Sequence, residues 1–215
     1  GITESSMARA RRPQGVSLDQ MLVARVRANP DAFVQGNVNR LKAGSVLQIP
    51  DQEQALATPT PQARELIAQA WDSGINIFDN AEIYAHGEAE RVMGDVIADL
   101  RLPRDGYCVS SKVFFGAAED PRPTQRGLSR KHVVEACHAA LQRLRVDYLD
   151  LYYCHRPDPD TPLVETVAAM DLLVRQGKVL YWGTSEWPES LIREAARIAR
   201  SNHLAAPVVE QPQYN

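Results

Sequence analysis

The stretch 146-VDYLDLYYCHRPDPDTPLVETVAAMDLLVRQGKVLYWGTSEW-187 contains one complete unit of the fold. It begins with an apolar run at 148–154 that is typical of a buried strand. A helical pattern follows, with Pro162 in its first turn and Gly177 just beyond its end, where these residues are favoured. A second apolar run at 179–183 predicts another strand. This order of elements predicts two parallel strands joined by a crossover helix.

The same alternation extends from residue 62 to the end of the chain. Ser129 is placed to cap one of the expected helices, whose apolar side holds Val133, Cys137 and Leu141. The other expected helices lie within 64–71, 88–100, 162–176 and 189–201, and the expected strands are 75–78, 107–110, 148–154, 179–183 and 208–210. Apolar strands joined by helices indicate a parallel sheet covered by helices, an α/β fold.

Two architectures fit this alternation, an open doubly wound sheet and a closed (β/α)₈ TIM barrel. A dinucleotide-binding open sheet is expected to carry G-x-G-x-x-G after its first strand, and the sequence has no such motif. Polar residues stand at the carboxyl ends of five successive expected strands, where barrel enzymes assemble their sites. They are Asp79, Lys112, His155, Ser185 with Glu186, and Gln211. This phasing favours the barrel.

Tyr84 follows Asp79 by five residues and is within reach of the same end of the barrel. A carbonyl reduction needs a proton donor, and a free phenol is too weak an acid near neutral pH unless a neighbouring positive charge stabilises the phenolate. Lys112 could supply that charge, and Asp79 could hold Lys112 in place. His155 would orient the substrate carbonyl. The alternative is that Asp79 and Lys112 form a purely structural ion pair, Tyr84 packs and His155 caps a loop.

The stretches GINIFDNAEIYAHGEAERVMG (74–94), SSKVFFG (110–116), 126–187 and VVEQPQYN (208–215) resemble the aldo-keto reductases, in the branch that includes potassium-channel β subunits. The resemblance implies a TIM barrel in which NADPH delivers hydride to an aldehyde or ketone. It assigns the catalytic roles to Tyr84 as proton donor with Asp79, Lys112 and His155, and the cofactor contacts to Ser185, Glu186 and Gln211. Glu186 stands where the family usually has Asn or Arg.

The resemblance covers strands two to six of the eight-stranded barrel. The residues expected for strands one, seven and eight are lacking, together with much of the expected grip on the cofactor. We therefore expect an incomplete barrel with exposed sheet edges and impaired activity. The alternative function is a non-catalytic fusion fragment that acts as an interaction module or a peptidoglycan-associated module.

The first fifty residues differ from the rest in charge. Residues 1–50 carry seven Arg or Lys against three Asp or Glu, a balance of +4, whereas residues 51–215 carry 17 against 24, a balance of −7. Residues 14–50 resemble the LysM-like module of the FimV-type pilus assembly family, and we expect this segment to be small and mainly helical. The opening strand and helix of that module are missing, so we do not expect peptidoglycan binding. We predict a LysM-like segment at 1–50, a linker at 51–61 and a partial barrel at 62–215.

Composition and charge exclude several other classes. The net charge of −3 argues against nucleic acid and anionic membrane as partners, and no apolar run approaches the length needed to span a bilayer. Three cysteines share no metal spacing, and no metal site is expected. Three reduced thiols and the absence of a visible signal peptide predict the cytoplasm. The expected partner is a small-molecule carbonyl substrate. A homo-oligomer is one of the states that the family resemblance allows, since its members range from monomers to tetramers.

Overall fold

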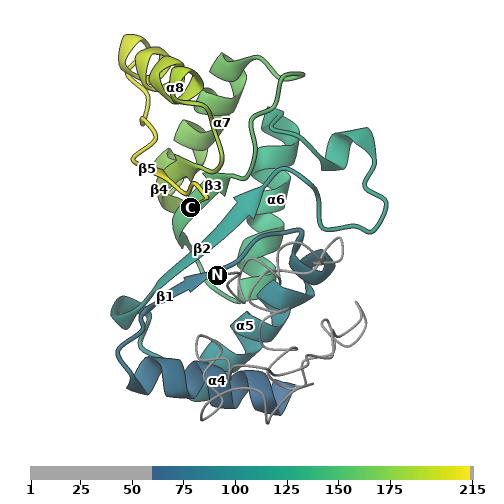
Figure 1. The fold of residues 1–215 in the computed structure, drawn as a ribbon, viewed down its shortest axis with the longest axis vertical. Helices are drawn as coiled ribbons and strands as arrows, with labels where there is room; N and C mark the ends of the chain where they lie inside the picture. Colours follow the sequence, from purple (N-terminus) through teal and green to yellow (C-terminus); the bar gives the residue numbers. More distant parts are fainter. Residues whose placement is uncertain (1–59, 214–215) are drawn as a thin grey trace, which may run out of the picture. The chain divides into compact units, whose positions relative to one another are not determined.

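The computed structural model describes residues 60–213 (Figure 1). Five helices and five strands alternate along this part, with short 3₁₀ turns between some of them. The helices are α4 (Thr60–Asp72), α5 (Glu88–Leu100), α6 (Arg130–Leu144), α7 (Leu163–Arg175) and α8 (Glu189–Ser201). The strands are β1 (Ile77–Asp79), β2 (Cys108–Val113), β3 (Leu149–Cys154), β4 (Val179–Thr184) and β5 (Val209–Glu210). The 3₁₀ turns are η3 (Tyr84–Gly87), η4 (Arg104–Gly106) and η5 (Pro123–Gln125).

The five strands form one parallel sheet in the order β1-β2-β3-β4-β5. Each strand therefore lies beside the next one along the chain, and the order never reverses as it does in a doubly wound sheet. With right-handed crossovers, a sheet of this order carries all its helices on one side, as a barrel does. The fold is α/β with an open half-barrel, and the predicted partial TIM barrel is confirmed.

The core lies between the sheet and the helices. Successive helices pack against one another in chain order, α5 on α6, α6 on α7 and α7 on α8. Val133, Cys137 and Leu144 from α6 are buried in this layer beside Tyr152 and Trp182 from the sheet. The opposite side of the sheet is less covered, since Ile77 and Tyr181 are each more than half exposed.

Most predicted elements lie where the sequence placed them. Ser129 caps α6, its hydroxyl accepting from the backbone N–H of His132 at 3.3 Å. Two boundaries need correction. α4 spans Thr60–Asp72 and is longer than the helix expected at 64–71. β2 extends to Val113, so Lys112 lies inside the strand and not beyond its end. The polar run Ser110–Lys112 concealed this, because each of these side chains finds a polar partner in the folded chain.

The predicted LysM-like segment at 1–50 and most of the predicted linker lie outside the described residues. These assignments stay predictions.

Candidate active site

Backbone hydrogen bonds beyond the strand ends fix the site residues in register. The N–H of His155 donates to the carbonyl of Val113 at 3.0 Å, and the N–H of Ser185 donates to the carbonyl of Cys154 at 3.0 Å. The N–H of Gln211 continues the same ladder on the carbonyl of Thr184 at 2.9 Å. Each of these residues thus follows the last residue of its strand and makes the next backbone hydrogen bond to the neighbouring strand. Because the strands are parallel, the carboxyl ends of the strands bring these residues to one edge of the sheet.

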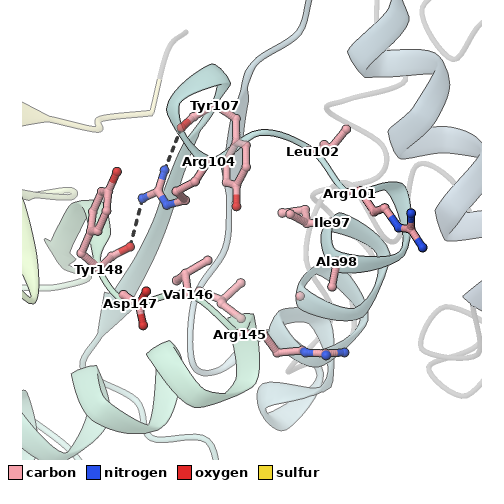
Figure 2. A pocket seen from close by; sticks show the side chains of 12 residues that line it. Ile97, Ala98, Arg101, Leu102, Arg104, Tyr107, Arg145, Val146, Asp147 and Tyr148 are labelled. Carbon is pink, nitrogen blue, oxygen red and sulfur yellow. Dashed lines mark hydrogen bonds between the residues drawn. The ribbon is translucent and has the colours of Figure 1, made fainter.

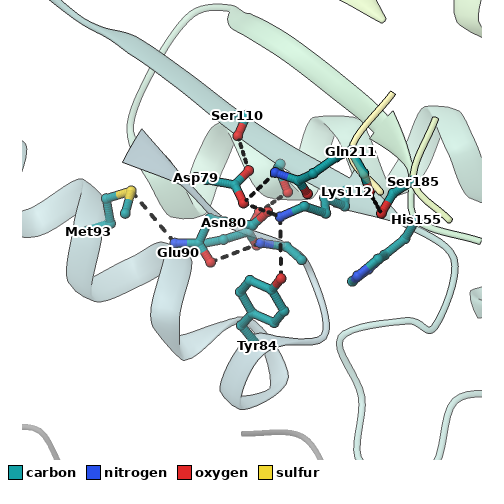
Figure 3. Close-up of polar contacts among 12 residues, drawn as sticks. Asp79, Asn80, Tyr84, Glu90, Met93, Ser110, Lys112, His155, Ser185 and Gln211 are labelled. Carbon is teal, nitrogen blue, oxygen red and sulfur yellow. Dashed lines mark hydrogen bonds and ion pairs between the residues drawn. The ribbon is translucent and has the colours of Figure 1, made fainter. Parts of the chain in front are cut away.

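Lys112 is the centre of the site (Figure 3). Its side chain is 1% exposed. The ammonium donates to Asp79 Oδ2 at 2.6 Å, to the backbone carbonyl of Asn80 at 2.8 Å and to the hydroxyl of Tyr84 at 3.3 Å. An ammonium has three hydrogens, and these three acceptors use all of them. The buried charge is therefore fully hydrogen-bonded, as burial of a charge requires.

Asp79 is the counter-charge and has two further partners. The hydroxyl of Ser110 donates to its Oδ1, and the side-chain amide of Gln211 donates to its Oδ2 at 3.3 Å. Ser110 is the register partner of Asp79 on the neighbouring strand, so the two side chains lie on the same face of the sheet. Asp79 therefore contacts Lys112 on one side and is itself held by Ser110 of β2 and by Gln211, the residue after β5.

Tyr84 and His155 face each other across the site. Their ring centroids are 6.0 Å apart with the planes at 83°, and Figure 3 shows the imidazole extending toward Tyr84. Tyr84 begins the turn η3, in which Ala85 (φ 49°) and His86 (φ 53°) adopt left-handed backbone angles. Such angles are uncommon in residues other than glycine and cluster at functional sites. The turn gives the chain the sharp change of direction that separates Tyr84 from helix α5.

The predicted cofactor residues divide into two groups. Ser185 is buried and its hydroxyl donates to the backbone carbonyl of Gln211 at 3.0 Å. Gln211 contacts both Ser185 and Asp79, so it joins the predicted cofactor pair to the predicted catalytic group. Glu186 is exposed, with φ 58°, and is not brought into this cluster. The structure thus brings together all the predicted site residues except Glu186.

A second tyrosine, Tyr153, also lies at this edge, paired in register with Lys112. Burial raises the pKa of Tyr153, and the negative charge of Asp79 raises it further. Its phenol therefore stays protonated and is a poor source of a proton. The ammonium of Lys112 instead contacts the hydroxyl of Tyr84.

Sequence reasoning did not single out Asn80, Ser110 or Phe115. The first two contact the charged pair directly, and the ring of Phe115 lies 5.2 Å from that of His155, edge to face. Alternation along β2 could have indicated Ser110, because it precedes Lys112 by two residues and shares its face. A backbone carbonyl such as that of Asn80 leaves no signal in the sequence.

A separate cavity of about 250 Å³ lies at the other end of the strands (Figure 2). Tyr107 and Tyr148, which line it, precede β2 and β3, and Arg104 stacks 3.8 Å above the Tyr148 ring. In barrels this end contributes to stability and the carboxyl end carries the chemistry. Within residues 60–213, no group of three or more His, Cys, Asp or Glu side chains could hold a metal ion. No helix in the same range is long and apolar enough to cross a membrane.

The chain is similar to several known proteins. Residues 48–215 match the model of the aldo/keto reductase family, so the match begins before the predicted linker. The chain is 47% identical over 154 residues to a probable voltage-gated potassium channel subunit beta of Arabidopsis thaliana, which covers 72% of this chain and 46% of that protein. A putative subunit of the same kind from Schizosaccharomyces pombe is 49% identical over 152 residues, covering 71% of this chain and 44% of that protein.

A solved structure is also similar. A thermostable aldo-keto reductase in complex with the inhibitor epalrestat superposes with a TM-score of 0.63 at 33% identity, covering 74% of this chain and 52% of that chain. The chain therefore spans about half the length of the relatives that it matches.

Proposed function

The chain belongs to the aldo/keto reductase family, and we propose that it contributes the catalytic half of an NADPH-dependent reductase of aldehydes and ketones. The observation that carries the proposal is the set of contacts around Lys112. A purely structural ion pair would need only Asp79, whereas here the ammonium also contacts the hydroxyl of a tyrosine that faces an imidazole.

The direction of the Lys112–Tyr84 hydrogen bond supports Tyr84 as proton donor. An ammonium can only donate, so the Tyr84 oxygen accepts from Lys112 and its own hydrogen is free to point elsewhere. A substrate carbonyl between Tyr84 and His155 would receive that hydrogen as the carbonyl carbon is reduced. The positive charge of Lys112 then stabilises the phenolate that remains. His155, whose ring faces that of Tyr84, would donate a second hydrogen bond to the same carbonyl oxygen.

The residues expected to hold the cofactor fit a carboxamide, the polar group of a nicotinamide ring. A carboxamide needs a donor for its oxygen and an acceptor for its nitrogen, and the Ser185 hydroxyl and the Gln211 amide offer both. When bound, a nicotinamide cofactor of the NAD(P)H type, typical of the family, supplies the hydride. Ser185 and Gln211 would orient its ring against the edge that carries Asp79. To do so, the Gln211 side chain gives up its long contact with Asp79.

Turnover of 4-nitrobenzaldehyde, followed by the loss of NADPH absorbance, tests this function. We expect reduction by the wild-type chain, at a rate impaired by the incomplete barrel, and a further loss of about 10²- to 10⁴-fold in kcat in Tyr84→Phe, the range for removal of a general acid. Tyr148→Phe is the matched control, since Tyr148 lies at the opposite end of the strands. NADPH binding, measured separately by fluorescence titration, should be equal in all three proteins.

Three results would count against the proposal. Turnover that survives in Tyr84→Phe would remove Tyr84 as proton donor. Equal loss in Tyr148→Phe would indicate a general defect of folding. NADPH binding without any turnover would reject the reductase function and favour the structural ion pair.

We also propose a small-molecule carbonyl as the partner, a homo-oligomer as one state to test, and the cytoplasm as compartment. A homo-oligomer would cover exposed apolar side chains such as Ile77 and Tyr181. Sedimentation of the purified chain tests the state.

A further inference from the structure

We propose that Glu82 and His132 are positioning residues that hold Phe115 against His155 and so shape the wall of the carbonyl site. The proposal rests on the proposed function. Both side chains are nearly inaccessible, Glu82 at 2% and His132 at 5% exposed, although both are ionisable and neither belongs to the Asp79–Lys112 cluster. Burial of two such groups is costly unless they are paired and hydrogen-bonded.

Four hydrogen bonds close a ring through these two residues. Glu82 Oε1 accepts from the backbone N–H of Phe114 at 2.7 Å, and the carbonyl of Phe114 accepts from the N–H of Gly127 at 2.6 Å. His132 Nδ1 lies 2.8 Å from the carbonyl of Gly127, and its Nε2 lies 3.3 Å from Glu82 Oε2. The ring thus ties the segment before Tyr84 to both ends of the loop between β2 and α6.

The ring fixes the protons on His132. A carbonyl oxygen only accepts, so Nδ1 carries a hydrogen, and Nε2 shares a proton with the Glu82 carboxylate. Burial opposes the charge on the imidazole, but the hydrogen bond and the charge of Glu82, the carbonyl of Gly127 and the charge of Glu135 outweigh it, and the pKa of His132 is raised. The raised pKa and the two hydrogen-bond acceptors on the ring nitrogens both favour the protonated imidazole of His132 beside Glu82.

Phe115 is the residue that this ring places. It stands between Phe114 and Gly116, whose N–H groups both donate to Glu82 Oε1, at 2.7 and 2.9 Å. The backbone on both sides of Phe115 is thus held by one carboxylate oxygen. The Phe115 ring lies 5.2 Å from the His155 ring and is 37% exposed, so it presents an apolar surface beside the carbonyl site. Glu82 therefore positions a wall that favours carbonyls with an aromatic or apolar substituent.

Variants of Glu82 separate charge from connectivity. In Glu82→Gln, Oε1 can keep both backbone contacts, but the carboxylate charge that faces His132 is gone. In Glu82→Ala, the side-chain contacts with Phe114, Gly116 and His132 are all lost, so the cycle of hydrogen bonds is broken. Glu135→Gln is the matched control, because it removes one carboxylate charge near His132 from an exposed side chain that pairs with Lys131.

Readouts that need no turnover come first. By nitrogen-edited NMR, we expect the midpoint of the His132 titration to fall by about one pH unit or more in Glu82→Gln and to move less in Glu135→Gln. In Glu82→Ala, the amides of Phe114 and Gly116 should exchange at least about tenfold faster, and the His155 ring protons should shift because Phe115 leaves them. Unchanged His132 titration, amide exchange and His155 shifts in the two Glu82 variants would overturn the proposal, whether or not the chain reduces carbonyls.

Turnover then tests the role in the reaction. We expect KM for 4-nitrobenzaldehyde to rise at least about fivefold in Glu82→Ala while kcat falls less than about twofold, with partial recovery in Glu82→Gln. Phe115→Ala should reproduce the rise in KM, and Phe115→Leu should restore part of it. If KM rises and kcat falls by the same factor in all these variants, Glu82 has a structural role only. If the wild-type chain has no turnover, the reductase function fails and the NMR results alone decide whether the ring holds Phe115.

Discussion

Replacement of Lys112 by methionine should lower the free energy of unfolding by about 2 kcal/mol. Methionine keeps the length and the apolar stem of the side chain but removes the ammonium and its three hydrogen bonds. The change therefore tests whether the charged cluster is coupled as its geometry indicates, independently of any turnover. Asp79→Asn and the double variant complete a double-mutant cycle.

The magnitude follows from the contacts. The bonds of Lys112 to Asp79 at 2.6 Å and to the Asn80 carbonyl at 2.8 Å involve a charged donor, and such bonds contribute about 1.5–3 kcal/mol each. The contact with Tyr84 at 3.3 Å is long and adds little. Against this gain stands the cost of burying the ammonium, several kcal/mol, which methionine removes. The Asp79 side chain is 36% exposed, so its carboxylate can regain hydrogen bonds to water in the variant. The net loss of unfolding free energy therefore stays near the low end of that range.

The double variant is the decisive measurement. Removal of both charges leaves neither one buried without a partner, so the double variant should be more stable than the sum of the single losses predicts. We expect a coupling energy of about 1.5–3 kcal/mol. Urea unfolding curves that share one m value give these differences directly. Strictly additive losses would refute the coupling and with it the inferred role of Asp79 in holding Lys112.

Three further outcomes are expected. The pKa of His132 is raised above its ordinary value of 6.5, so protonated His132 stabilises the fold fully below about pH 6.5. This stabilisation is lost as the pH rises through the pKa of His132 in the folded state. The urea midpoint of unfolding should therefore fall as the pH rises through that pKa in the wild type, and fall less in Glu82→Gln. Gly94→Ala should lower the free energy of unfolding by about 1–3 kcal/mol, because a Cβ would lie 2.5 Å from the Arg143 carbonyl oxygen on α6; an unchanged thermal midpoint would contradict this packing. Burial raises the pKa of the Cys137 thiol to about 12, so a thiol reagent at neutral pH should label the half-exposed Cys108 first, and equal labelling without urea would contradict the buried position.

The order of the strands and the place of the site could be read from the sequence for one physical reason. Apolar strands joined by helices leave only a parallel sheet, and a parallel sheet gathers the carboxyl ends of its strands at one edge. Asp79, His155, Ser185 and Gln211 were each identified from their place after an apolar run, without any knowledge of contacts. The structure brings these residues to one edge, as the pattern indicated.

The ring of Glu82 and His132 could not be read in this way. The two residues are fifty positions apart, and each was unremarkable in its own segment. His132 lies six residues from His138 and does not share a helix face with it, so its spacing gives no sign of a metal pair. The role of His132 depends on a backbone carbonyl at Gly127 and a carboxylate from another loop, and neither partner leaves a periodic signal. The length of β2 was underestimated for a related reason, because the polar side chains of Ser110 and Ser111 are buried only with their partners.

Gly183 shows how packing of the sheet determines the geometry of the site. The register pairs Lys112 with Tyr153 and Tyr153 with Gly183, so Gly183 lies two strands from the ammonium. A Cβ on Gly183 would lie 2.5 Å from Val209 Cγ1 and from the Val209 carbonyl oxygen, and 3.2 Å from the Tyr153 ring. Any side chain would therefore have to displace Val209 or press Tyr153 toward Lys112. Val209 begins β5, and Gln211 follows two residues later, where its amide contacts Asp79. Because glycine has no side chain, β5 can approach β4 at Gly183 closely enough for Gln211 to reach the charged pair.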